Sequence, residues 1–336
     1  MTVCTGASEA TGTGASEATG STSDGFQLDE LPALSRTAVP RNDLLRDNAD
    51  ELARLWSTAR LLPVDRRGRA PMGRSGDRPV LDFRATPGPT PPADAVLLGE
   101  QDGVCYWAVR AEPDGPVQEG MGWDATLPDT DEPVWQDLRL AGGLLSAEDA
   151  GLLTTAVAVL SWHDNAGFCA KCGSRVELKR AGWATHCTGC GREEYPRTDP
   201  AVICLVHDGG DQVLLARQPI WPPDRYSVLA GFVEGGESLE ACVVREICEE
   251  VGITVESVRY LGSQPWPFPR SLMVGFTAVG DPTKPLVPAA GEIEKARWVH
   301  RDEVRAVLAA SGTGPGLILP GVTSIARRML ESWANA

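Results

Sequence analysis

Three glutamates with helical spacing are the residues best suited to do chemistry in this chain. Glu246, Glu249 and Glu250 lie at i, i+3 and i+4, so a helix would place them on one face. Like charges at this spacing cost a helix about 0.2–0.5 kcal/mol per pair, unless a cation lies between them. Mg²⁺ and Mn²⁺ prefer such oxygen ligands, keep bound water and share substrate phosphates. The pattern therefore predicts a metal site that hydrolyses phosphoanhydrides, and the alternative is a solvated helix face.

The glutamates belong to a longer pattern that runs from Gly231 to Ile253. The segment has the form G-x5-E-x7-R-E-U-x-E-E-x-G-U, where U is aliphatic, and every fixed position is met. It resembles the Nudix box, a loop, helix and loop that binds divalent metal and hydrolyses a nucleoside diphosphate linked to another moiety. We expect Arg245 to pair with a box glutamate and orient it, and Gly231 and Glu237 to have structural roles. The sequence leaves open which of the three catalytic glutamates is the general base.

Four cysteines predict a second metal site. Cys169 and Cys172 form one C-x2-C pair and Cys187 and Cys190 another, with fourteen residues between the pairs. This spacing is typical of a closed, structural Cys4 zinc ribbon. A glycine follows each pair, as a tight knuckle requires. Nucleic-acid binding by the ribbon is a weaker alternative, because the segment between the pairs carries few cations and one aromatic residue.

Composition limits the classes of function. The formal net charge is −15 and the pI is near 4.8, which opposes broad affinity for nucleic acid. The sequence contains neither a long apolar stretch nor a basic start followed by an apolar run. We therefore expect a cytoplasmic protein with no membrane contact. The cysteines outside the zinc pattern are scattered among apolar neighbours, which suits a reducing compartment.

The elements that must position these sites divide the chain into five segments. Residues 1–25 repeat the hexapeptide GASEAT and predict a disordered tail. Residues 26–145 alternate short apolar runs with proline and glycine breaks, which predicts a mostly β N-terminal domain. A linking helix with a capping serine is expected in 146–168, the zinc ribbon in 169–194 and the catalytic domain in 195–336. The expected fold class is α+β.

A proline-rich segment, SQPWPFPRSLM, occupies residues 263–273. Its alternate prolines exclude a helix and a central strand, so we expect a stiff extended loop. Such a loop would present Trp266 and Phe268 to a flat heteroaromatic ring. Together with the box and the preceding Cys4 ribbon, the segment resembles the signature of the NADH pyrophosphatases, in which it marks a preference for NAD(H). The resemblance covers roughly residues 146–336 and implies a Nudix α/β/α sandwich.

The resemblance also implies further site residues. It adds the backbone carbonyl of Ala230 and the side chain of Glu292 to the three box glutamates as ligands of Mg²⁺ or Mn²⁺. It implies a homodimer in which Tyr195 reaches across to the partner subunit. The remaining residues that it places against NAD(H) are Phe232, Gln264, Pro265, Trp266, Pro267, Phe268, Pro269, Arg270, Ser271 and Ala326.

The predicted function is metal-dependent hydrolysis of NAD(H) to nicotinamide mononucleotide and AMP. Removal of NAD caps from RNA 5′ ends is a second expected activity, since relatives remove such caps and the bond is the same. Two alternatives remain. One is a Nudix hydrolase of ADP-ribose or nucleotide sugars, and the other is a non-catalytic NAD sensor or nucleic-acid binder.

Overall fold

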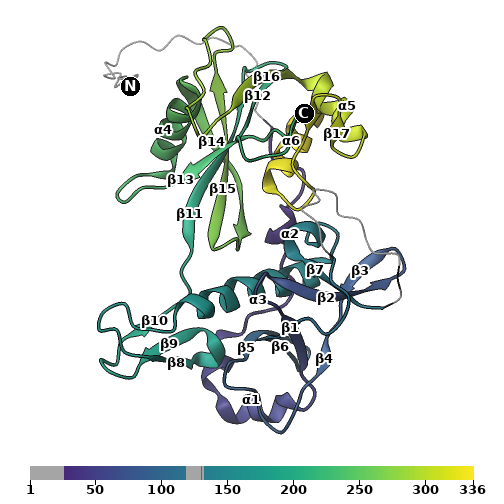
Figure 1. Cartoon of the computed structure of the whole chain (residues 1–336), viewed down its shortest axis with the longest axis vertical. Coiled ribbons are helices and arrows are strands. Elements are labelled where there is room, and N and C mark those ends of the chain that lie inside the picture. Colours follow the sequence, from purple (N-terminus) through teal and green to yellow (C-terminus); the bar gives the residue numbers. More distant parts are fainter. Residues whose placement is uncertain (1–25, 119–129, 131) are drawn as a thin grey trace, which may run out of the picture.

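The computed structural model describes residues 26–118, 130 and 132–336. The tail predicted over 1–25 lies outside these residues. The described chain forms two lobes: the N-terminal sheets and the ribbon make one, and a large sheet with its helices makes the other (Figure 1). Within the described part, no helix has the length and apolar character needed to cross a membrane.

The N-terminal lobe is built mainly of strands, as its alternating apolar runs predict. One sheet has the order β4-β1-β6-β5 and a second has the order β3-β2-β7. Leu62, Val96 and Leu153 are fully buried in the core that these sheets share with helix α3. The elements are η1 (Ala33–Ser35), η2 (Asp43–Asp47), α1 (Ala49–Trp56), β1 (Arg60–Val64), β2 (Arg69–Ser75), β3 (Arg78–Leu81), β4 (Arg84–Ala85), β5 (Val96–Gln101), β6 (Val104–Arg110), β7 (Val134–Asp137), α2 (Leu138–Ala141) and α3 (Ala147–Asn165).

Helix α3 leads directly into a small three-stranded sheet that carries the cysteines. The Ser146 hydroxyl caps the helix by accepting a hydrogen bond from the Asp149 amide at 3.0 Å, as the sequence predicts. The sheet has the order β10-β9-β8 and lies beside α3 at the lower left of Figure 1. Its elements are β8 (Val176–Lys179), η3 (Arg180–Gly182), β9 (Ala184–Cys187) and β10 (Glu193–Glu194).

The C-terminal lobe is a sheet with helices on both faces. Its strand order is β14-β15-β11-β12-β16, and β13 pairs separately with β11. Successive β11 side chains face opposite layers, so Val202 packs on the α4 side and Ile203 on the α6 side. This is the expected α/β/α sandwich. The elements are β11 (Asp199–His207), β12 (Gln212–Arg217), β13 (Leu229–Phe232), α4 (Leu239–Val251), β14 (Val255–Trp266), β15 (Ser271–Gly280), β16 (Lys295–His300), α5 (Arg301–Ala309), β17 (Thr313–Gly314), β18 (Leu317–Ile318) and α6 (Ile325–Asn335).

The expectation of an extended loop over 263–273 is wrong for most of that segment. Strand β14 continues through Trp266 and β15 begins at Ser271, and these two residues lie opposite each other. Pro265 lies within β14 and is tolerated because β14 is the edge strand, whose outer N–H groups need no ladder partner. Only residues 267–270 form a turn. The aromatic side chains are therefore held at the end of a hairpin.

Candidate active site

The box glutamates are positioned by strand β13 and helix α4, which meet in a close contact. Ser238 begins the helix, since its hydroxyl accepts a hydrogen bond from the Ala241 amide at 3.2 Å. Gly231 on β13 faces the helix so closely that a Cβ there would lie 1.9 Å from the Cδ of Glu246. A glycine is therefore required at this position for the Glu246 carboxylate to lie against the strand.

Arg245 ties the glutamates of this segment together. Its guanidinium donates to both carboxylate oxygens of Glu237 at 2.7 and 2.8 Å, and to Glu246 and Glu249 at 2.9 Å each. It also donates to the Phe232 carbonyl at 3.0 Å. Its hydrogen bonds are the main reason that the pKa of Glu237 falls to about 2. Arg245 thus contacts three carboxylates, and its contact with Glu237 joins the loop to the helix.

Glu250 is the most deeply buried of the box glutamates, with 3% of its surface exposed. Burial is the main reason that its pKa rises to about 8, and the nearby carboxylates of Glu246 and Glu292 contribute to the same rise. Burial also raises the pKa of Glu246, against the lowering effect of Arg245. The Oε2 atom of Glu250 is buried and accepts no hydrogen bond from any residue that the structure describes. The backbone of Ala230 forms a hydrogen bond with the Glu250 side chain. The site therefore brings several carboxylates and one unsatisfied carboxylate oxygen together beside Ala230.

Glu249 is more exposed to solvent than Glu246 and Glu250. Its side chain is 60% exposed and contacts Arg245. It lies on the same helix face at the solvent side of the cluster, where it could meet a metal together with substrate. A cavity of about 120 Å³ adjoins the cluster and is lined by Ala230 and Glu250 together with Ile203, Trp221 and Ser227, among others.

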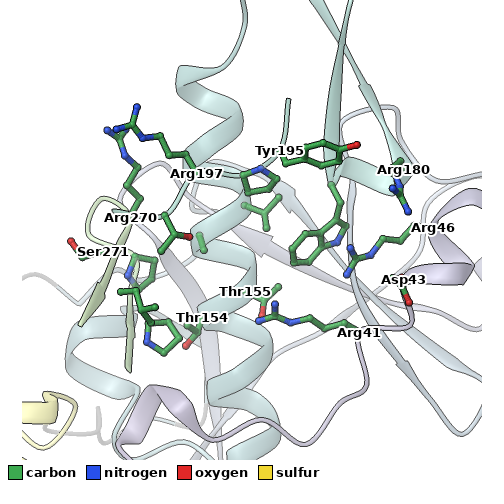
Figure 2. Close-up of a pocket in the computed structure, with 18 residues that line it drawn as sticks. Arg41, Asp43, Arg46, Thr154, Thr155, Arg180, Tyr195, Arg197, Arg270 and Ser271 are labelled. Atoms are coloured by element: carbon green, nitrogen blue, oxygen red, sulfur yellow. The ribbon is translucent and has the colours of Figure 1, made fainter. Parts of the chain in front are cut away.

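Five of the residues expected to contact NAD(H) line a second, larger cleft of about 640 Å³ (Figure 2). They are Tyr195, Pro265, Pro267, Arg270 and Ser271. Phe232 lies at the end of β13 and is 58% exposed, and Tyr195 is 55% exposed. Both rings are therefore available for contact with a ligand or a partner subunit.

Of the other residues expected to contact NAD(H), two are buried, two are partly buried and one is exposed. Gln264 is fully buried and donates from its side chain to the Thr323 carbonyl at 3.1 Å. Trp266 and Phe268 contact each other edge to face and pack against the N-terminal core, with Arg139 over the Phe268 ring at 4.8 Å. Ala326 is buried at the start of α6, and Pro269 is exposed in the hairpin turn.

The four cysteines converge as predicted. Their sulfur atoms all lie within 4.8 Å of one another, with 3.7 Å between Cys169 and Cys190 and 3.4 Å between Cys172 and Cys187. Tetrahedral zinc with bonds of about 2.3 Å would set its sulfurs about 3.8 Å apart. The glycines after each pair have positive φ, 74° at Gly173 and 70° at Gly191. The cluster fits a structural zinc ion.

Sequence reasoning missed the arginines of the larger cleft. Arg41, Arg46, Arg180 and Arg197 line it, but they come from separate segments and match no motif. No local signal could have found them, because only the packing of the two lobes brings them together.

A sheet between two helical layers, with a glutamate-bearing loop and helix on one face, is the architecture of a Nudix domain. Family models match residues 197–316 as a NUDIX domain, 164–195 as an NADH pyrophosphatase zinc ribbon domain, and 50–162 as an NADH pyrophosphatase-like rudimentary NUDIX domain. The last match falls where the sequence offered no motif.

Curated relatives cover nearly the whole chain. The NAD-capped RNA hydrolase NudC of Mycobacterium bovis (strain BCG / Pasteur 1173P2) is 48% identical over 92% of this chain and 96% of its own. The enzyme of that name from Mycobacterium tuberculosis (strain ATCC 25618 / H37Rv) gives the same figures. The one from Stutzerimonas stutzeri (strain A1501) is 42% identical over 70% of this chain and 85% of its own. The chain belongs to this NADH pyrophosphatase family of Nudix hydrolases.

Proposed function

We propose that this chain hydrolyses the diphosphate bond of NAD(H), releasing nicotinamide mononucleotide and AMP. By the same cleavage it removes NAD from the 5′ end of capped RNA. The observation that carries the proposal is the mutual proximity of Glu246, Glu250 and Glu292 beside Ala230, with a buried carboxylate oxygen left unsatisfied. The names of the relatives support NAD as the substrate.

A hard divalent cation fits this donor set. The carboxylates of Glu246, Glu249, Glu250 and Glu292, with the carbonyl of Ala230, would hold Mg²⁺ or Mn²⁺. When bound, the metal neutralises the diphosphate, orients it and lowers the pKa of a coordinated water. The repulsion that raises the pKa of Glu250 is the interaction that such a cation relieves.

The chain's own residues supply position and proton transfer. One of the box glutamates takes the proton from the attacking water. Arg245 holds Glu246 and Glu249 in place, so that their carboxylates do not have to reorganise during the reaction.

We further propose that the exposed rings of Phe232 and Tyr195 contact the nicotinamide end of the substrate, Tyr195 from the partner subunit of a homodimer. The signature residues then divide into two groups. Pro265, Pro267, Arg270 and Ser271 border the larger cleft. Gln264 and Ala326 are buried, and Trp266 and Phe268 pack against the N-terminal core, so these four residues hold the hairpin and α6 in place without bordering the cleft.

A substrate panel tests this function. The expected result, with Mg²⁺ or Mn²⁺ present, is that kcat/KM for NADH and for NAD-capped RNA exceeds that for ADP-ribose and nucleotide sugars. A ranking led by ADP-ribose would make the chain a general Nudix hydrolase. Binding of NADH without turnover would make it a sensor.

A further inference from the structure

The larger cleft lies where three parts of the chain meet. Arg41 and Arg46 come from the N-terminal lobe, Arg180 from the ribbon, and Arg197 and Arg270 from the start of the catalytic sheet and its hairpin. Figure 2 shows Arg197 and Arg270 on one side of the cleft and Arg41, Arg46 and Arg180 on the other. Arginines therefore lie on both sides of the cleft.

Carboxylates only partly neutralise these arginines. Arg197 and Arg270 share Asp199 at 2.8 and 2.7 Å, and Arg180 pairs with Asp47 at 3.0 Å. Asp43 also lines the cleft, and Glu193 accepts a hydrogen bond from Tyr195 at its rim. Five guanidinium groups still outnumber these four carboxylates, in a chain whose net charge is −15. A cleft with an excess of positive charge in so acidic a protein indicates a binding site for an anion.

Arg41 and Arg46 are the least neutralised of the five. Neither forms an ion pair within 4.0 Å with any described residue, and both stack on Trp183, at 5.5 and 3.9 Å from the ring centroid. The Nε of Arg46 is buried without a hydrogen-bond partner among the described residues. Burial lowers the pKa of both groups; for Arg46 the charges of Arg41 and Arg180 lower it further, and Asp43 and Asp47 only partly oppose the shift. Holding these charges here therefore costs stability. An anion between them would recover that cost.

The cleft is a short step from the catalytic strand. On β11, Ile203 pairs with Ala230 beside the glutamates, and Asp199 pairs with Ser271 at the cleft. Four residues of strand span roughly 13 Å. A chain leaving the glutamate site along β11 therefore reaches Arg197 and Arg270, which both pair with Asp199, within its first few nucleotides.

We propose that this arginine cleft binds the phosphodiester backbone of the RNA attached to NAD, and that Arg41 and Arg46 each neutralise a phosphate. The inference rests on the proposed function and extends it, because it gives the N-terminal lobe a part in recognising the RNA. Repeated phosphates suit cations spread over two walls, whereas NADH alone carries only the diphosphate held at the glutamates.

The experiment compares kcat/KM for NADH and for a ten-nucleotide NAD-capped RNA, over a range of salt, in the full chain. The variant is Arg41→Gln/Arg46→Gln. The matched control, Arg67→Gln/Arg78→Gln, removes two exposed N-terminal arginines outside the cleft. The salt slope is the slope of the logarithm of the RNA binding constant against the logarithm of the salt concentration. Each lost phosphate contact on a single strand reduces this slope by about 0.7. Two lost contacts therefore reduce it by about 1.4 and weaken RNA binding by about 25-fold at 0.1 M salt.

The expected result is this loss on capped RNA alone, with NADH turnover within twofold of the parent and the control unchanged. The variant Arg41→Lys/Arg46→Lys keeps both positive charges and should therefore keep most of the salt slope. If the two arginines acted only through packing, the lysines would not restore RNA binding. If the double glutamine variant unfolds, Arg197→Gln, on the opposite wall, should still reduce the slope by about 0.7.

Equal losses on both substrates, or losses matched by the control, would overturn the cleft assignment. If the parent chain does not cleave NADH, the proposed function fails separately. Anisotropy of a labelled 5′-monophosphate RNA then tests the cleft without catalysis: weaker binding by the double variant supports it, and unchanged binding refutes it.

Discussion

Replacing Gly231 by alanine should disable the glutamate site by displacing one carboxylate. The added Cβ would lie 1.9 Å from Cδ and 2.1 and 2.2 Å from the two oxygens of Glu246. The backbone itself can accept alanine, because Gly231 lies in an ordinary strand opposite Val202. The substitution therefore acts on Glu246 and not on the chain conformation.

The size of the displacement follows from these distances. Nonbonded carbon atoms do not approach within about 3.0 Å, so the Glu246 carboxylate must move by about 1 Å. A misplacement of about 1 Å can reduce a rate by about 100-fold, which corresponds to about 2.7 kcal/mol of barrier. The hydrogen bond from Arg245 to Glu246 would also lengthen, at a cost of about 1–3 kcal/mol of stability.

The assay is steady-state NADH hydrolysis with saturating Mg²⁺ or Mn²⁺, together with the thermal unfolding midpoint. Gly235→Ala is the matched control in the same loop, since a Cβ there meets nothing within 4 Å. We expect the control to keep parental kcat and the Gly231 variant to lose about 100-fold while remaining folded. Activity within threefold of the parent would refute the claim that Glu246 must lie against β13.

Three further changes probe the site and the ribbon. Because the pKa of Glu250 is raised from 4.5 to about 8 on folding, its stabilising contribution is complete below pH 4.5 and is lost as the pH rises through 8. Without metal, the unfolding midpoint of Glu250→Gln should therefore rise relative to that of the parent as the pH increases from 5.5 to 8.5. A difference in midpoint that stays constant over this range would contradict the raised pKa. Arg245→Lys should lower kcat by about 10- to 100-fold, since lysine cannot bridge Glu237, Glu246 and Glu249 together; parental kcat would contradict this. Cys172→Ser should abolish zinc binding, measured by mass spectrometry of the metal content, and lower the unfolding midpoint; retained zinc would show that the four sulfurs are not the ligands.

The box and the ribbon could be predicted from the sequence because their residues are close together along the chain. Helical spacing alone places Glu246, Glu249 and Glu250 on one face, and two C-x2-C pairs fold into knuckles by local geometry. The α+β class and the sandwich followed from the same local patterns and from the box resemblance.

Features that depend on long-range packing were missed. The alternate prolines indicated a loop, but an edge strand tolerates them, and that position is set by the order of the whole sheet. The arginine cleft likewise requires contact between lobes, which no local pattern encodes.

The most direct test of the central claim is product analysis after incubating the purified chain with NADH and Mg²⁺ or Mn²⁺. We predict AMP and reduced nicotinamide mononucleotide in equal amounts, no products after metal chelation, and almost none from a folded Glu250→Gln variant. Absence of AMP from the parent chain with metal present, or full activity in the Glu250 variant, would contradict the account.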